Sequence, residues 1–287
     1  MDTEKIFLNY LKQYDQNDDK IHLKIVHTWG VVQAIDFIVS DMNLKEEDKE
    51  LARLIALLHD IGRFEQLKKY HTFDDTVMPH AQCSVDILFR DGLIREFVAD
   101  RNLDTIIYNA IRLHGVYRID DSMYRLYRKQ DIKEWEKNLP VLKDEELLNR
   151  VKLHTKLIRD ADKVDNFRVK SMEEVRTMVD VTEYELGNEA ITESIYDTFM
   201  AHTPILNSSR VTHMDMWVSY LGYLFDFNFN SGLKYILEQD YINKIVDRIP
   251  YTNQDTRKKM EAIRKEALSY IEGRIKTKSD ESMDGRQ

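Results

Sequence analysis

Cysteine is nearly absent from this chain, because only one of its 287 residues, Cys83, carries a thiol. A single cysteine excludes an intrachain disulfide and any zinc site built from several thiolates. Proline and glycine are also scarce, with 4 and 9 residues respectively. Since these two residues interrupt or end helices, their scarcity favours helices throughout, and we expect an all-α fold.

Long apolar runs are missing as well. No uninterrupted apolar stretch approaches the roughly 18 residues that span a bilayer, and the first residues do not resemble a secretory signal. We therefore expect a cytoplasmic protein without a membrane partner. The net charge of −9 argues against general nucleic-acid binding, because affinity for phosphate backbones depends on clustered lysine and arginine.

The most informative segment is an apolar run that ends in an adjacent histidine and aspartate. Apolar residues recur at helical spacing over 51–58, which predicts a buried helix. His59 and Asp60 then lie at its buried end, and Gly62 is expected to stop the helix. A buried carboxylate is costly unless a cation accompanies it, and the residues before Asp60 offer no positive partner. A metal ion would supply that charge.

Four further polar residues stand among apolar neighbours in segments with helical periodicity: His27, His80, His114 and Asp162. Each one alone is more often a hydrogen-bonded core group than a metal ligand. Together with the His-Asp pair they form a mixed imidazole and carboxylate set. Such a set suits Mn, Fe, Ni, Co or Zn and contains too much nitrogen for calcium.

This spaced set resembles the HD superfamily of metal-dependent phosphohydrolases. The resemblance spans residues 20–170 and implies an all-helical HD-domain bundle. It is carried by His27, by His59 and Asp60 at the end of an apolar helix, and by Asp162 in an Ala-Asp-Lys-Val-Asp context. By position, these four residues would hold the first metal ion.

Two further histidines are similar to the extra histidines of the binuclear branches of this superfamily. They are His80, followed by Ala-Gln-Cys-Ser, and His114, which follows Ile-Arg-Leu and precedes Gly115. The resemblance implies that they hold a second ion with Asp60 as the bridge, so that each chain binds one or two divalent transition-metal ions. The Gly-Tyr-Pro signature of the cyclic-di-GMP phosphodiesterases is missing, which argues against a cyclic-dinucleotide substrate.

The resemblance also implies catalytic roles. Asp60 would act as the metal bridge, and Arg63 takes the place of a basic residue that contacts a substrate phosphate. Lys163 and Asp165 would orient ligands or water. The implied reaction is hydrolysis of a nucleotide or another small phosphate ester. Two alternatives stay open, a mixed-valent di-iron oxygenase of the same superfamily and a non-catalytic metal-stapled binding module.

The rest of the chain carries weaker signals. The charge-rich stretch 116–146 indicates a surface excursion, or alternatively a basic, aromatic cover over a phosphate pocket. We divide the chain into an HD core at 1–170, a helical extension packed on it at 171–275 and a polar tail at 276–287 expected to be disordered. The extension is a candidate for shaping the pocket or for a homodimer interface.

Overall fold

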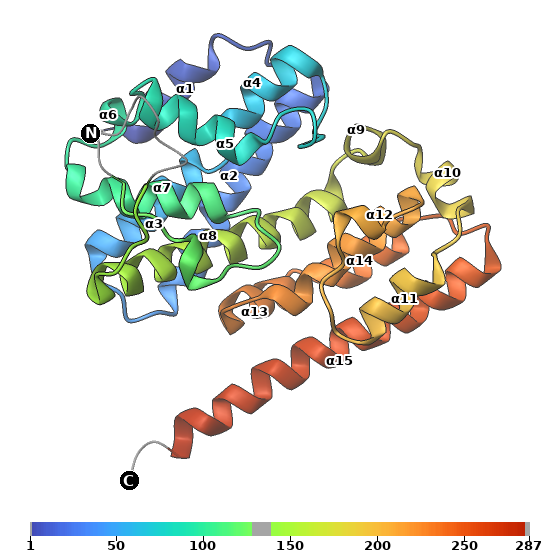
Figure 1. Ribbon diagram of the computed structural model, residues 1–287. Helices are drawn as coiled ribbons and strands as arrows, with labels where there is room; N and C mark the ends of the chain where they lie inside the picture. Colours follow the sequence, from blue (N-terminus) through green and yellow to red (C-terminus); the bar gives the residue numbers. More distant parts are fainter. Residues whose placement is uncertain (1, 128–138, 285–287) are drawn as a thin grey trace. The chain divides into compact units, whose positions relative to one another are not determined.

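The computed structural model describes residues 2–127 and 139–284, and describes side chains as far as residue 277 (Figure 1). Within these ranges the chain forms helices and no strand, apart from an isolated antiparallel bridge between Arg125 and Val141. The all-α fold class is therefore confirmed. The chain divides into two compact units, Met1–Ala161 and Asp162–Gln287.

The first unit is built from helices that pack around a common apolar core. They are α1 (Thr3–Leu11), α2 (Asp19–Ser40), α3 (Glu46–Leu58), α4 (Ile61–Tyr70), α5 (His80–Val85), α6 (Ile94–Phe97), α7 (Asp104–Leu113) and the first part of α8 (Glu145–Met172). A π-helical turn, Asp86–Arg90, extends α5. Two short 3₁₀ turns, Arg101–Leu103 and Asp121–Met123, flank α7. Helix α2 packs on α3 and α4, while α5 packs on α4 and α7. These contacts bring together the helices that carry the predicted ligands of this unit.

Helix α2 forms because its start is capped and its apolar side chains are buried. The side chain of Asp18 accepts hydrogen bonds from the backbone N–H groups of Lys20 and Ile21. By length and composition this helix also meets the requirements of a membrane span, with 22 residues and a mean hydropathy of 1.2. Half of that apolar window is buried inside the fold, against α3 and α4. Core packing therefore accounts for its hydropathy.

The second unit continues α8 and adds a set of shorter helices that pack on a long final one. Its further helices are α9 (Val175–Val179), α10 (Glu183–Asn188), α11 (Glu193–Met200), α12 (His213–Leu221), α13 (Asn230–Glu238), α14 (Tyr241–Asp247) and α15 (Gln254–Asp284). Two 3₁₀ turns, Asn207–Ser209 and Gly222–Asp226, lie on either side of α12. Helices α11, α13 and α14 pack on α15, and Trp217 and Phe199 are fully buried. The aromatic residues of this region thus contribute to its core.

The predicted division of the chain does not coincide with these units. Their boundary lies between Ala161 and Asp162, inside α8, rather than at residue 170. The tail predicted at 276–287 begins inside α15, which continues to Asp284, and residues 285–287 lie outside the described part. The roles assigned to the three predicted parts, as HD core, helical extension and tail, stay predictions.

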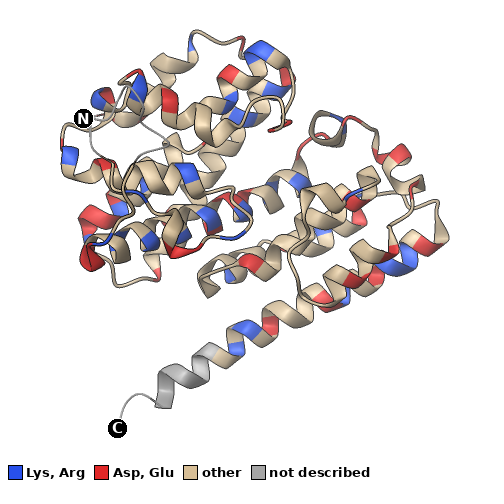
Figure 2. Ribbon diagram, viewed as in Figure 1, with Lys and Arg blue, Asp and Glu red and all other residues tan. Residues whose placement is uncertain are grey.

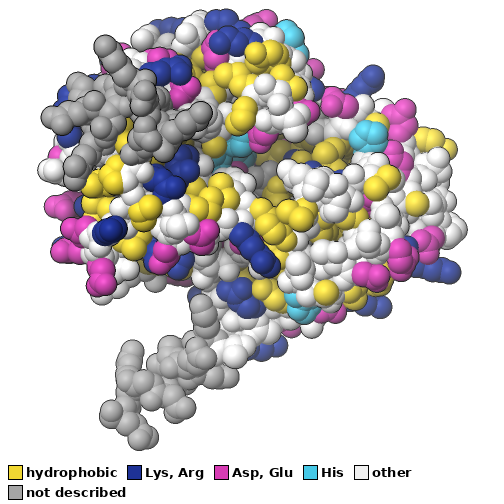
Figure 3. Space-filling model, viewed as in Figure 1, with side chains coloured by type: hydrophobic (Ala, Val, Ile, Leu, Met, Phe, Trp, Pro, Cys, Tyr) yellow, Lys and Arg dark blue, Asp and Glu magenta, His cyan; other side chains and the backbone are white. Residues whose placement is uncertain are grey.

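Charged side chains are spread over the helices of both units. Basic and acidic residues are intermixed along the ribbon (Figure 2), and on the visible surface they alternate with apolar side chains (Figure 3). The charges that sum to −9 are thus spread over the whole chain. A strongly charged region must therefore arise where particular residues of one sign lie together.

Candidate metal centre

The His-Asp pair lies at the corner between two helices. His59 is the C-cap of α3, and Asp60 is the N-cap of α4, with φ −108° and ψ 18°. This non-helical backbone at Asp60 interrupts the helix, so two successive side chains can face one centre. The prediction that Gly62 ends the helix is wrong, because Gly62 lies in the first turn of α4.

Gly62 instead allows two helices to approach closely. A Cβ atom at this position would lie 2.4 Å from the backbone nitrogen of Ser84 and 2.6 Å from the carbonyl oxygen of His80. The Gly62 N–H donates a hydrogen bond of 2.9 Å to Ser84 Oγ. Only a residue without a side chain permits this contact, which brings α5 and His80 toward Asp60.

Four histidines surround Asp60, and its two carboxylate oxygens face different pairs of them. Oδ2 lies 3.8 Å from His27 Nε2 and 3.7 Å from His59 Nε2. Oδ1 lies 3.5 Å from His80 Nε2 and 3.6 Å from His114 Nε2. All five residues are buried, and they form two groups that can each hold a metal ion: His27, His59 and Asp60, and Asp60, His80 and His114.

Two of these histidines are oriented by the helix ends on which they lie. His59 Nδ1 is 2.7 Å from the carbonyl oxygen of Ala56, and His114 Nδ1 is 2.7 Å from that of Ile111. A carbonyl can only accept, so Nδ1 carries the proton in both rings. Both residues are the C-caps of their helices and bond to the carbonyl three positions earlier. Each Nε2 is then left with a lone pair that points into the centre.

His80 is oriented by a carboxylate from the preceding loop. Its Nδ1 donates a hydrogen bond of 2.6 Å to Asp75 Oδ1, which turns its Nε2 toward the centre. Burial, together with the charge of Arg63, lowers the pKa of His80 to about 4. Burial by itself would raise the pKa of Asp75, but its hydrogen bond to His80 and the charge of Arg63 hold that pKa below the usual range. A neutral His80 beside an ionised Asp75 is the form that binds a metal.

Asp60 has one cationic partner that the sequence analysis missed. Lys24 Nζ lies 2.7 Å from Asp60 Oδ2, so the expectation that no earlier residue offers a positive charge is wrong. Burial by itself would raise the pKa of Asp60, but the charge of Lys24 holds it well below the usual value.

The cation near the other half of the centre is more distant, since Arg63 Nε lies 3.8 Å from Asp60 Oδ1. Asp60 Oδ1 is buried and accepts no hydrogen bond in the described part of the structure. It faces the lone pairs of His80 and His114, whose Nε2 atoms are only 3.0 Å apart. Lone pairs that converge in a buried site repel one another unless a cation lies among them. The residues present therefore fit a divalent metal ion.

A comparison with protein families gives this site a context. Residues 25–167 match the family model described as HD domain. The chain contains an HD domain. The matched range includes every predicted metal ligand, and HD domains are mostly metal-dependent phosphohydrolases that bind divalent metals. Searches among curated proteins and among solved structures found no match.

The HD domain uses Asp75, a residue that the sequence analysis did not identify. Its carboxylate accepts hydrogen bonds from the side chain of His80 and from Arg63 Nη1, at 2.6 and 2.8 Å. Its only signal in the sequence is its place five residues before His80, in a loop without periodicity. A loop residue of this kind cannot be matched with the histidine that it orients before the fold is known.

We predict that Asp75→Asn weakens binding of the second metal ion by about 10- to 100-fold, because carboxylates that orient ligating histidines have effects of this size. Metal titration by calorimetry measures the change. The matched control is Asp74→Asn, which alters an exposed neighbour whose carboxylate bonds to Thr76 N–H instead. Equal affinities in the two variants would show that Asp75 does not orient His80 for a metal.

Arg63 of the HD domain is engaged in holding this loop. Its Nη1 donates to Gln66 Oε1, Phe73 O and Asp75 Oδ1 at 2.7, 3.0 and 2.8 Å. Its Nε is 3.8 Å from Asp60 Oδ1. The guanidinium thus links the loop to the His-Asp corner, and its predicted role as a phosphate clamp stays a prediction.

Arg159 of α8 fixes the end of the helix that carries His114. Its Nη1 donates to the carbonyl oxygens of Leu113, His114 and Val116, the first two at 3.2 and 3.0 Å. The side chain is buried. The last carbonyls of a helix lack partners within it and carry partial negative charge, so a buried cation there stabilises α7 at the point where His114 must be held.

The remaining predicted residues lie at the start of the second unit, on α8: Asp162, Lys163 and Asp165. Asp162 Oδ1 accepts a hydrogen bond of 2.9 Å from Asn166 Nδ2. Lys163 Nζ is 2.8 Å from Asp226 Oδ2, and Asp165 pairs with Arg168. The predicted roles of these three residues, as a ligand and as orienting groups, stay predictions.

Proposed function

We propose that the HD domain of this chain hydrolyses a small phosphate ester at a binuclear metal centre. The observation that carries the proposal is the division of Asp60, whose Oδ2 faces His27 and His59 while its Oδ1 faces His80 and His114. A carboxylate in this position can bridge two ions. His27, His59 and Asp60 would hold the first ion, and Asp60, His80 and His114 would hold the second.

Bound divalent ions supply Lewis acidity, since they polarise a phosphoryl oxygen and lower the pKa of water. The chain's own residues prepare the site for this role. Backbone carbonyls keep the protons of His59 and His114 on Nδ1, and Asp75 does the same for His80. Because these rings are held in place, little reorganisation is needed when charge develops on the phosphoryl group.

A pocket beside this centre supports a small substrate. It has a volume of about 440 Å³ and is lined by residues of the first unit that include Asp75, His80 and Gly115. Pockets of roughly 300 to 1,000 Å³ accommodate small molecules rather than polymers. We therefore propose a small phosphorylated partner. The cytoplasmic location and the homodimer stay predictions.

Metal analysis of purified protein tests the binuclear centre. We expect two ions per chain by plasma mass spectrometry and about one in each of the variants His59→Ala and His80→Ala, since each removes a ligand from a different group. Phosphate release from a panel of phosphate esters should fall in both variants. The control His213→Ala changes a half-buried histidine of the second unit that pairs with Glu189, and it should retain both ions and full activity.

The same purified protein distinguishes hydrolysis from the two alternative functions, a di-iron oxygenase and a binding module. Substrate-dependent oxygen uptake by iron-loaded protein without phosphate release would contradict hydrolysis and favour the di-iron oxygenase. The absence of turnover on the panel, together with unchanged thermal stability after metal removal, would favour a binding module.

A further inference from the structure

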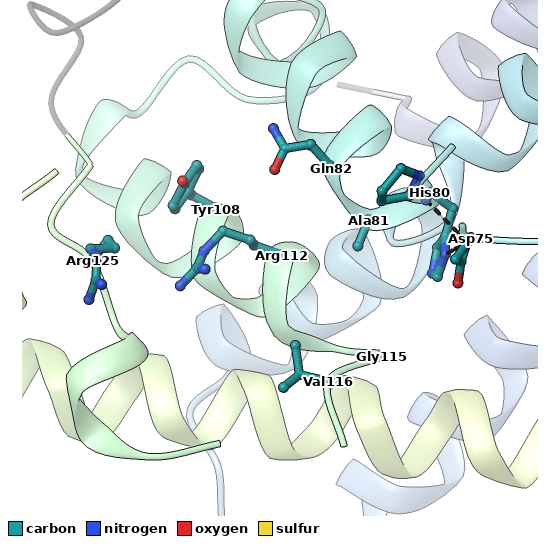
Figure 4. Close-up of a pocket in the computed structure, with 10 residues that line it drawn as sticks. Asp75, His80, Ala81, Gln82, Tyr108, Arg112, Gly115, Val116 and Arg125 are labelled. Atoms are coloured by element: carbon teal, nitrogen blue, oxygen red, sulfur yellow. Dashed lines mark hydrogen bonds and ion pairs between the residues drawn. The ribbon is translucent and has the colours of Figure 1, made fainter. Parts of the chain in front are cut away.

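The pocket beside His80 has a basic end. Arg112 and Arg125 line it together with Gln82 and Tyr108, whereas His80 and Asp75 lie at the other end (Figure 4). Arg112 is on α7, two residues before His114. One wall of the pocket therefore runs from a metal-ligand group to a pair of guanidinium groups.

The positions of both arginines are set by neighbouring carbonyl groups. Arg112 donates to the carbonyl oxygen of Met123, and its guanidinium lies 5.7 Å from the centre of the Tyr108 ring. Arg125 donates to the carbonyl oxygens of Ser122 and Tyr124. These contacts orient the two guanidinium groups that line the pocket.

Asn109 anchors the segment of Arg125 to α7. Its Oδ1 accepts a hydrogen bond of 2.8 Å from the Arg125 N–H, and its Nδ2 donates one of 2.7 Å to the Arg125 carbonyl. Asn109 is fully buried. The backbone of Arg125 is thus tied to the helix that carries Arg112, so the two arginines keep a defined relation to each other.

The acidic group that lines the pocket is already compensated. Asp75 accepts hydrogen bonds from Arg63 and His80, at the end of the pocket opposite Arg125. Arg63 itself is held by this contact and by Gln66. In a chain with a net charge of −9, the basic end of this pocket is therefore a local feature that favours a negatively charged ligand.

We propose that Arg112 and Arg125 bind a second oxyanion of the substrate, which makes the substrate a phosphate ester whose leaving group carries its own phosphate or carboxylate. The inference rests on the proposed hydrolase function, because it assigns the far end of the molecule that the metal centre would cleave. Guanidinium groups suit this task, since their planar forks donate paired hydrogen bonds to such oxyanions.

A matched set of substrates tests the proposal on the unmodified, metal-loaded protein. Propyl phosphate has a neutral leaving group, 3-phosphooxypropanoate adds a carboxylate, and propane-1,3-diol bisphosphate adds a phosphate. Diol bisphosphates of four to six carbons test longer separations between the two phosphates. We expect kcat/KM at least about tenfold higher for a doubly anionic compound than for the alkyl phosphate of equal length. The doubly anionic compound with the larger increase in kcat/KM shows whether the second oxyanion is a phosphate or a carboxylate.

Variants test whether the two arginines cause the preference for doubly anionic compounds. Arg112→Gln and Arg125→Gln should each reduce the advantage of the doubly anionic compound by about tenfold, whereas the control Arg90→Gln should not. Arg90 is a half-exposed arginine of the same unit that pairs with Asp86 and does not line the pocket. Equal kcat/KM for singly and doubly anionic compounds would overturn the subsite and leave the hydrolase standing.

Direct binding provides a readout that needs no turnover. Calorimetry with propane-1,3-bisphosphonate and with propylphosphonate, both resistant to hydrolysis, should show tighter binding of the bisphosphonate and loss of that difference in the arginine variants. This result without hydrolysis of any ester would support the subsite and contradict the proposed function. Equal affinities for the two phosphonates, unaffected by the variants, would contradict the subsite.

Discussion

Replacing Asp60 with asparagine should remove both metal ions and slow phosphate-ester hydrolysis by about a thousandfold or more. Asparagine keeps the size of the side chain but loses its charge, and its NH₂ group cannot serve as a ligand. Because Oδ1 and Oδ2 face different histidine pairs, one substitution weakens both groups. Metal content by mass spectrometry and kcat/KM on the best ester of the panel measure the two losses.

The size of this effect distinguishes a bridging Asp60 from a ligand of one ion. Circular dichroism should show that the variant remains helical, so that loss of metal is not loss of fold. Asp91→Asn is the control, since Asp91 is exposed and pairs with Arg90. A variant Asp60→Asn that retained one ion would contradict the bridge, and one that retained both would contradict the centre as a whole.

Gly62→Ala should destabilise the first unit by about 3 kcal/mol and weaken binding of the second ion. The added Cβ would lie within 2.4 to 2.8 Å of backbone atoms of His80, Cys83 and Ser84. Backbone atoms of a helix cannot rotate away as a side chain can, so α5 would have to shift. Since α5 carries His80, the shift would displace a ligand of the second group.

Thermal unfolding of the metal-free protein and metal titration measure these two consequences. Gly273→Ala is the matched control, because nothing lies within 4 Å of a Cβ at that position of α15. Alanine there should stabilise the helix by about 0.5 to 1 kcal/mol. If Gly62→Ala unfolded at the wild-type temperature and bound two ions, the close contact between α4 and α5 would not govern the position of His80.

Much of the fold and part of the site follow from local patterns in the sequence. Few prolines and glycines together with helical periodicity predict an all-α chain, because both features act within a few residues along the backbone. The same reasoning places His59 at the end of an apolar helix and His80 at the start of another, as in the structure. It identified His27, His59, Asp60, His80 and His114, which the structure brings together.

Local patterns did not reveal the groups that hold these residues in place. Lys24 contacts Asp60 across 36 positions of the chain, and Arg159 bonds to His114 across 45. Asp75 comes from a loop without periodicity. The role of Gly62 was misread as a helix end, because a close approach between helices leaves no mark on the residues beside the glycine.

The sequence by itself thus determined the fold class, the buried face of each ligand-bearing helix and the residue types around a metal. Periodicity decides which side of a helix is apolar, and that information is local. The tertiary structure alone decided which helix lies opposite, so it alone showed that Asp60 faces two histidine pairs, that Arg63 bonds to Asp75 and that Arg112 and Arg125 share a pocket with His80. Such pairings depend on the packing of distant segments, which no local pattern encodes.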